Sequence, residues 1–135
     1  MRNPKKRMRT KSGGRRELRK LESYIGADER VDRIVTGFYG NGTGILVLTD
    51  RRLVFIKDGH MSKRTEDFAL RNITSVAWQP GMVLGTVIIT AAGVRAEIKN
   101  VHKGDGKELV DLVRTRLAAR PPSFSAGALV ARFPA

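Results

Sequence analysis

Cysteine is absent from this chain of 135 residues, and histidine occurs only twice, at His60 and His102. The absence of cysteine excludes thiol catalysis, Cys-ligated zinc and a disulfide framework, and it is typical of a reducing cytosol. Neither histidine has beside it the serine or carboxylate pattern that nucleophilic or metal catalysis requires. The carboxylate pairs Asp28-Glu29 and Glu66-Asp67 are adjacent, so on strands they would point to opposite faces. We therefore expect a protein without enzymatic activity, metal or cofactor.

Long apolar runs are missing as well. No stretch approaches the roughly 20 residues that cross a bilayer as a helix. A secretory signal needs an apolar region of about 7–15 residues after its basic start, whereas here the basic start leads into Ser12-Gly13-Gly14 and further arginines. We expect a non-secreted, cytoplasmic protein of one domain, since this length buries a core without disulfides.

Acidic residues are scarce at the N-terminus, where Glu17 stands alone against ten cations in the first twenty residues. This segment carries +9 of the net charge of +13. It holds too few large apolar side chains to offset its chain entropy, so residues 1–14 are expected to form a disordered basic arm. A folded domain is expected at 15–120 and a flexible tail at 121–135. The candidate anion-binding residues of the arm are Arg2, Lys5, Lys6, Arg7, Arg9, Lys11, Arg15 and Arg16.

What the chain does have is a strong β pattern. Two apolar runs, within residues 44–56, are joined only by the polar Asp50-Arg51 break, which predicts a buried hairpin. Gly40 to Gly44 is glycine-rich, but a phosphate-binding loop would be followed by a helix, and a strand follows here. We therefore interpret Asn41-Gly42 as a hairpin turn with positive φ. The other strands are expected at residues 31–39, 62–69, 73–79, 83–89 and 94–99, with turns at Pro80-Gly81, whose glycine takes a positive φ, and at Ala92-Gly93.

Two helices flank these strands. The spacing of Leu18, Leu21 and Ile25 predicts a short amphipathic helix from Arg15 to Tyr24. Asp105 as N-cap, with Glu108 three residues later, predicts the start of a second helix, which Pro121-Pro122 ends. Its buried stripe is expected to hold Leu109, Leu112, Val113 and Leu117. The predicted fold is mainly β: a seven-stranded antiparallel barrel of two bent sheets, capped by one C-terminal α-helix and preceded by a short N-terminal helix.

From about Leu21 to Leu117 the chain resembles the bacterial pleckstrin-homology-like domains of the YokE-like group. The resemblance rests on residues 44–56 with their Leu-Thr-Asp-Arg-Arg-Leu centre, on Ile73-Thr74-Ser75-Val76, on Gly85-Thr86-Val87-Ile88-Ile89 and on the Leu-rich final helix. It implies the same barrel fold. Nearly all of these residues build the fold, so the resemblance implies an architecture that serves lipid binding, peptide binding and scaffolding alike. It also implies that such domains can associate through strand edges.

The resemblance places a candidate anion site at the connection of the third and fourth strands. Relatives that bind phosphoinositides generally use basic residues there and on the first hairpin, and here Lys57, Lys63 and Arg64 flank the connection. The first hairpin loop has no basic residue, and Asp58, Glu66 and Asp67 lie close by. The alternative interpretation is that the three cations are solvated charges that discourage pairing of a strand edge.

A second candidate is the turn that follows the fifth strand. Trp78 and Met82 stand there with Val83 and Leu84 beyond. If Val76 points inward then Trp78 does too, and core packing explains it; the alternative is an apolar tip for contact with a partner or membrane.

The function we expect is a non-enzymatic binding or scaffolding domain that the basic arm attaches to an anionic membrane surface. Each Lys or Arg near such a surface contributes on the order of 1 kcal/mol. The alternatives are a nucleic-acid-associated protein, since basic arms also neutralise phosphates, and a protein-interaction or self-assembly module with no lipid role. The folded part offers no base-reading helix and no aromatic-studded basic strand, so nucleic acid comes second.

Overall fold

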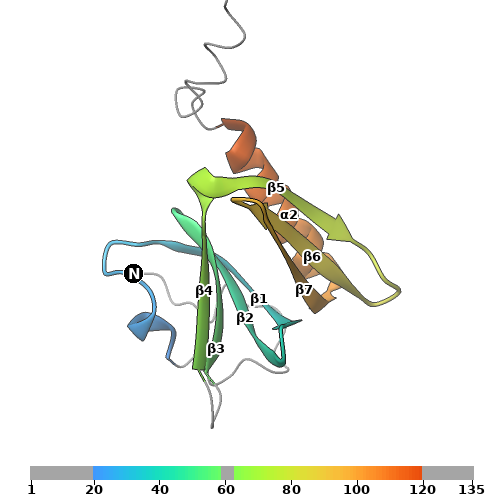
Figure 1. Ribbon diagram of the computed structural model, residues 1–135, viewed down its shortest axis with the longest axis horizontal. Coiled ribbons are helices and arrows are strands. Elements are labelled where there is room, and N and C mark those ends of the chain that lie inside the picture. The colour runs from blue at the N-terminus through green and yellow to red at the C-terminus, as the bar shows by residue number, and fades with distance from the viewer. Residues whose placement is uncertain (1–19, 59–62, 120–135) are drawn as a thin grey trace, which may run out of the picture.

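The computed structural model describes residues 20–58 and 63–119, which form seven antiparallel strands and one long helix (Figure 1). The predicted fold class is confirmed. In chain order the elements are η2 (Leu21–Ser23), β1 (Val31–Tyr39), β2 (Gly42–Thr49), β3 (Arg52–Asp58), β4 (Lys63–Ala69), η3 (Leu70–Asn72), β5 (Ile73–Gln79), β6 (Leu84–Ala91), β7 (Val94–His102) and α2 (Lys103–Ala119). The basic arm and the C-terminal tail lie outside the described residues.

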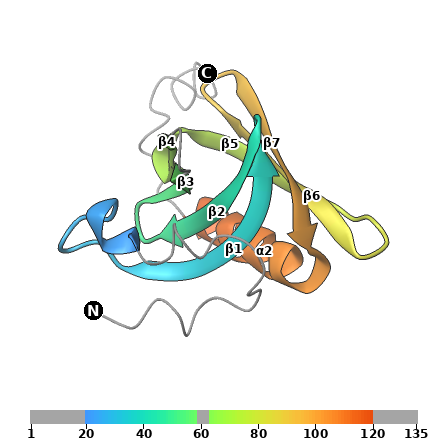
Figure 2. The same cartoon turned by 90° about the horizontal axis from the view of Figure 1, so that it is seen from below.

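The strands form one sheet in the order β4-β3-β2-β1-β7-β6-β5, so β4 and β5 are its edges. Where we expected two bent sheets, two meanders are joined through β1 and β7, at a pairing of Phe38 with Lys99. The short η3 turn carries the chain from the first meander to the second. Figure 2 shows α2 lying against the curved sheet, and its buried Leu109, Val110 and Val113 belong to the core between them.

Strands β2 and β3 are buried on both faces, which explains their unbroken apolar runs. Leu46, Leu48 and Phe55 point into the core that α2 completes. Their neighbours Ile45, Val47, Val54 and Ile56 point to the other face, where Leu21 and Ile25 of the N-terminal segment cover them. Over residues 20–24 the segment does this with the 3₁₀ turn η2, so the predicted α-helix is wrong there: the burial of Leu21 and Ile25 against β2 and β3 needs no regular helix. Residues 15–19 lie outside the described part.

Two turns differ from prediction. The first hairpin turns at Gly40-Asn41, one residue early, and Gly40 takes the positive φ of 67°. Gly81 does not have a positive φ. It is required for another reason: a Cβ there would lie 2.1 Å from the Leu84 carbonyl oxygen. The predicted turn at Ala92-Gly93 is present, with φ of 52° and 80°.

Helix α2 follows β7 without a connecting residue. It begins at Lys103, so Asp105 lies within the first turn and the predicted N-cap position is wrong. The carboxylate still lies at the helix N-terminus, where the helix dipole favours a negative charge. In the buried stripe, Leu109 and Val113 are fully buried as expected, Leu112 and Leu117 are partly buried, and Val110 joins them.

A basic end of the sheet as candidate functional site

The candidate site is the end of the sheet where β3 leaves and β4 returns. Lys57 and Arg64 are directly opposite each other in the β3–β4 pairing. Side chains alternate along a strand, and Phe55 points into the core, so Lys57 lies on the inner face. By the same alternation Arg64 shares the inner face of β4 with Phe68. The two cations therefore lie together on the inner face, at one end of the curved sheet.

Arg64 is held by an aromatic ring. Its guanidinium carbon lies 4.7 Å from the centroid of the Tyr39 ring, which is a cation–π distance. Its Nη2 also donates to Glu66 Oε1 at 3.0 Å, while the Tyr39 hydroxyl donates to Glu66 Oε2 at 2.9 Å. Burial, helped by Glu66, raises the pKa of the Tyr39 hydroxyl. Tyr39 thus positions Arg64, a role that the sequence analysis missed.

The first hairpin loop has no basic residue of its own, but two basic side chains, Lys57 and Arg64, lie against it. Lys57 Nζ donates to Asn41 Oδ1 at 3.4 Å. A Cβ on Gly42 would lie 2.3 Å from Lys57 Cε, and one on Gly40 would lie 2.2 Å from Arg64 Nη1. The hairpin turn therefore packs directly against both cations because its glycines lack side chains. This joins the two loops that the sequence analysis treated separately.

Lys63 lies at the same end on the outer face, beside Asp58. Asp58 is buried there: the Tyr24 hydroxyl donates to its Oδ2 at 2.6 Å and Lys20 Nζ lies 3.6 Å from its Oδ1. The hydrogen bond from Tyr24 lowers the pKa of Asp58 against the opposing effect of burial, and the charges of Lys20 and Lys63 lower it further. The three predicted cations thus share one end of the sheet but not one face.

Two of the acidic residues near this end pair with basic residues of the same end, and the third, further along β4, pairs with Arg52. Asp58 is engaged by Tyr24 and Lys20, and Glu66 by Arg64 and Tyr39. Asp67 Oδ1 lies 2.8 Å from Arg52 Nη1, further along β4. The carboxylates that flank the cations in sequence therefore neutralise this end only in part.

Lys20 connects the predicted arm with this end. It is the first described residue, and the basic segment precedes it directly in the chain. Because Lys20 lies beside Asp58, the segment joins the domain where Lys57, Lys63 and Arg64 lie. The arm residues themselves, Arg2 to Arg16, lie outside the described residues.

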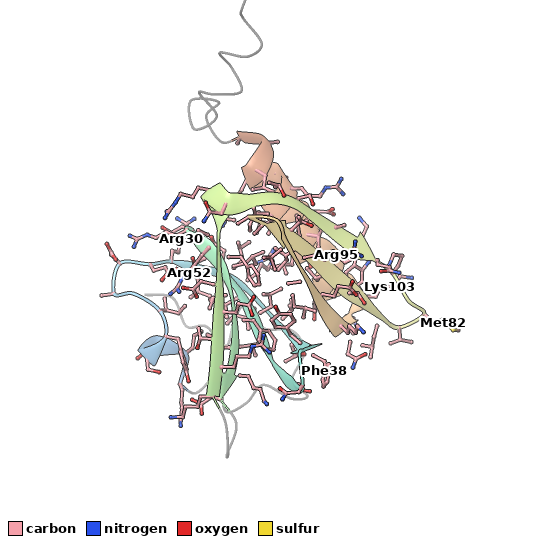
Figure 3. The ribbon with its side chains drawn as sticks, in the orientation of Figure 1. Arg30, Phe38, Arg52, Met82, Arg95 and Lys103 are labelled. Atoms are coloured by element: carbon pink, nitrogen blue, oxygen red, sulfur yellow. The ribbon has the colours of Figure 1, made fainter. Side chains whose placement is uncertain are left out.

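The second predicted site is at the β5–β6 connection. Trp78 is partly buried and packs against the core, close to Gly85 and Gly106. Met82 is 95% exposed, and Val83 and Leu84 are 66% and 45% exposed. The structure therefore separates the pair: Trp78 packs against the core next to Gly85 and Gly106. Met82 lies at the tip of the connection (Figure 3).

The Leu-Thr-Asp-Arg-Arg-Leu centre has a structural task. The Thr49 hydroxyl accepts from the backbone N–H of Arg51 and Arg52, both at 3.1 Å, and donates to Glu29 Oε2 at 2.6 Å. Arg116 on α2 donates to the Thr49 carbonyl at 2.8 Å and also bonds to Asp32. These contacts tie the N-terminal segment, the β2–β3 turn and α2 together.

Over residues 20–58 and 63–119, no group of three or more His, Asp or Glu side chains is arranged to hold a metal ion. Within the same ranges no helix is long and apolar enough to span a membrane.

Seven antiparallel strands in this order with a C-terminal helix define a pleckstrin-homology-like fold. The Vps36 N-terminal PH domain is similar in structure, with a TM-score of 0.52 and 16% sequence identity, over 70% of this chain and 83% of that chain. The family model for the bacterial PH domain matches residues 25–115, and the chain belongs to this family. No curated protein matches the sequence. Domains of this class are generally binding or scaffolding modules and not enzymes.

Proposed function

We propose that this bacterial PH domain binds the surface of an anionic membrane through its basic N-terminal segment and the end of the sheet that holds Lys57, Lys63 and Arg64. The observation that carries the proposal is the position of Lys20 beside Asp58. The segment therefore joins the domain at the end of the sheet that holds the three cations. We also propose that the domain belongs to the YokE-like group, on the motifs given above.

Charge makes an anionic bilayer a suitable partner. The segment of residues 1–20 carries +9, and each cation near an anionic surface contributes on the order of 1 kcal/mol. A flat bilayer can meet cations on both faces of the sheet end at once, whereas a small ligand would meet one face. Lys57 and Arg64 lie on the inner face and Lys63 on the outer. Because the cations are divided between the two faces, they suit contact with a membrane surface better than a pocket for a single lipid headgroup.

The test is sedimentation of the full chain with vesicles that contain about 30% phosphatidylserine, over a salt series, beside vesicles of phosphatidylcholine alone. We expect binding to the anionic vesicles only, weakening as salt rises. Duplex DNA is added as a competitor. Release by DNA at equal phosphate concentration would favour the nucleic-acid alternative. If the chain binds neither vesicles nor DNA, the protein-interaction alternative is favoured.

A charge-matched pair of variants locates the surface. The first replaces Lys57, Lys63 and Arg64 by glutamine, and the second replaces the exposed Arg71, Arg95 and Arg114 by glutamine. Both lower the net charge by three, but Arg71 lies in η3, at the opposite end of β4 from Lys63. We expect the first variant to lose vesicle affinity by about tenfold or more and the second to lose much less. Equal losses would mean that net charge alone matters.

Self-association through a strand edge is a second proposal, and β5 favours it. The other edge strand, β4, carries Lys63, Arg64, Glu66 and Asp67, and such charges discourage pairing with another strand. Strand β5 has no charged residue in its seven positions. A molar mass from light scattering that exceeds the 14.9 kDa of one chain would support it.

A further inference from the structure

The β5–β6 connection exposes three consecutive large apolar side chains, Met82, Val83 and Leu84. Over the described residues, the one other exposed large apolar side chain is Val94, at the opposite end of β6. Single exposed apolar residues are ordinary on a protein surface, but three in a row at a protruding tip are not. Figure 3 shows Met82 at the outer end of this connection, away from the body of the sheet.

The tip is held firmly in its exposed position. The Lys103 backbone N–H donates to the Val83 carbonyl at 3.1 Å, which ties the tip to the start of α2. Gly81 allows a close turn against the Leu84 carbonyl. Beneath them the Trp78 ring fills the space over Gly85 and Gly106. Folding back onto the core would break these contacts, so the apolar side chains remain outside.

Two lysines lie near the base of the tip. Lys103 follows His102, which is paired with Leu84 across the β6–β7 ladder, and Lys99 lies three residues before His102 on β7; both lysines are exposed. The carboxylate in this region, Asp105, is buried. An apolar tip with cations at its base matches the order of layers in an anionic bilayer, where acyl chains lie beneath anionic headgroups.

We propose that Met82 and Val83 insert into the interfacial layer of an anionic bilayer, with Lys103 and Lys99 at the level of the headgroups. The inference rests on the proposed membrane function and extends it, because it adds an apolar contact, on a different connection, to the electrostatic one. A chain held by cations alone is released by salt, whereas apolar insertion resists it.

The absence of cysteine allows a direct test. Met82→Cys and, as the matched control, Val94→Cys are each labelled with a polarity-sensitive dye in the full chain. Both positions are exposed, and they lie at opposite ends of the β6 region. On vesicles with about 30% phosphatidylserine, we expect the dye at position 82 to brighten, shift to the blue and be quenched by brominated acyl chains. The dye at position 94 should not change.

A second measurement removes the apolar side chains. The double variant Met82→Ser with Val83→Ser should bind the anionic vesicles about fivefold to tenfold more weakly, since it loses apolar burial, while Val94→Ser should bind as the natural chain does. Both variants keep every charge.

The outcomes separate the two proposals. If the unmodified chain does not sediment with anionic vesicles, the membrane function fails and this inference fails with it. If the chain sediments but the dye at position 82 behaves like that at position 94, or the serine variant binds equally well, insertion is wrong and the electrostatic attachment stands. A tip that captures a protein instead would give that second result.

Discussion

Arg52 on β3 holds Glu29, which lies ahead of β1, by two hydrogen bonds: Nε donates to Oε2 at 2.8 Å and Nη2 to Oε1 at 3.0 Å. Arg52 also donates to the Tyr24 carbonyl and pairs with Asp67, so one side chain joins the N-terminal segment to β3 and β4. Glu29 is 5% exposed. The N-terminal segment, from which the basic arm extends, is thus fixed to the domain by an ion pair whose carboxylate is buried.

This pair predicts a loss of stability in acid. The hydrogen bond from Arg52, aided by Thr49, lowers the pKa of Glu29 to about 2, despite burial. Because the folded-state pKa lies below the unfolded value of 4.5, the stabilisation is complete above pH 4.5 and is lost as pH falls towards 2. The loss is about 3 kcal/mol at most. Urea unfolding across this pH range measures it.

The Glu29→Gln variant is the control for that titration. It should be less stable than the natural chain at neutral pH and should lose less stability between pH 4.5 and 2. Part of the acid dependence should remain, since Asp58 and Asp32 also have lowered pKa values. If the variant keeps the full pH dependence, the Glu29 ion pair is not its source.

The contact between Trp78 and Gly106 predicts opposite effects at two glycines of α2. A Cβ on Gly106 would lie 2.1 Å from Trp78 Cζ3, so Gly106→Ala must displace the ring and should destabilise the domain by about 1–3 kcal/mol. Gly104→Ala meets only His102 ring atoms, at 3.8 Å, and should stabilise it by up to about 1 kcal/mol. Thermal melts measure both, and Trp78, the single tryptophan, reports its own displacement by fluorescence. Equal effects at the two glycines would contradict the packing.

The β6–β7 turn carries removable strain. Ala92 has a φ of 52°, a conformation that costs a residue with a Cβ roughly 1–2 kcal/mol. Because Asn followed by Gly suits such a turn, Ala92→Asn should stabilise the domain by about 0.5–1 kcal/mol. Ala92→Val should destabilise it. A stability ranking from chemical denaturation that puts valine above asparagine would contradict the turn assignment.

The parts of the fold that the sequence predicted are those that local patterns encode. The runs at 45–48 and 53–56 contain β-formers between short polar breaks, and both become buried strands.

The predicted N-terminal helix was only partly right. It was predicted over residues 15–24 from the spacing of apolar residues that include Leu21 and Ile25, and these two are indeed buried. Their partners, Val47 and Val54, lie on β2 and β3, and within the described residues the segment makes this contact with the 3₁₀ turn Leu21–Ser23.

The site required knowledge of the register. Lys57 and Arg64 were found as basic residues near a loop. Their contact with the first hairpin depends on Gly40 and Gly42, and a glycine in the sequence does not indicate which side chain packs against it. Lys20 and Tyr39 were missed because their partners, Asp58 and Arg64, are distant in sequence. The apolar tip was visible as Met82 and Val83, whereas the support from Trp78 and Lys103 was not.

The central claim is that the basic segment attaches the domain to an anionic membrane. Its most direct test compares the full chain with a chain that begins at Arg15, which keeps every described residue, in sedimentation with phosphatidylserine vesicles at about 0.15 M salt. Circular dichroism melts check that both are folded. We expect the full chain to sediment with the vesicles and the shortened chain to stay largely in solution. Equal sedimentation of the two chains, or none of either, would contradict the claim.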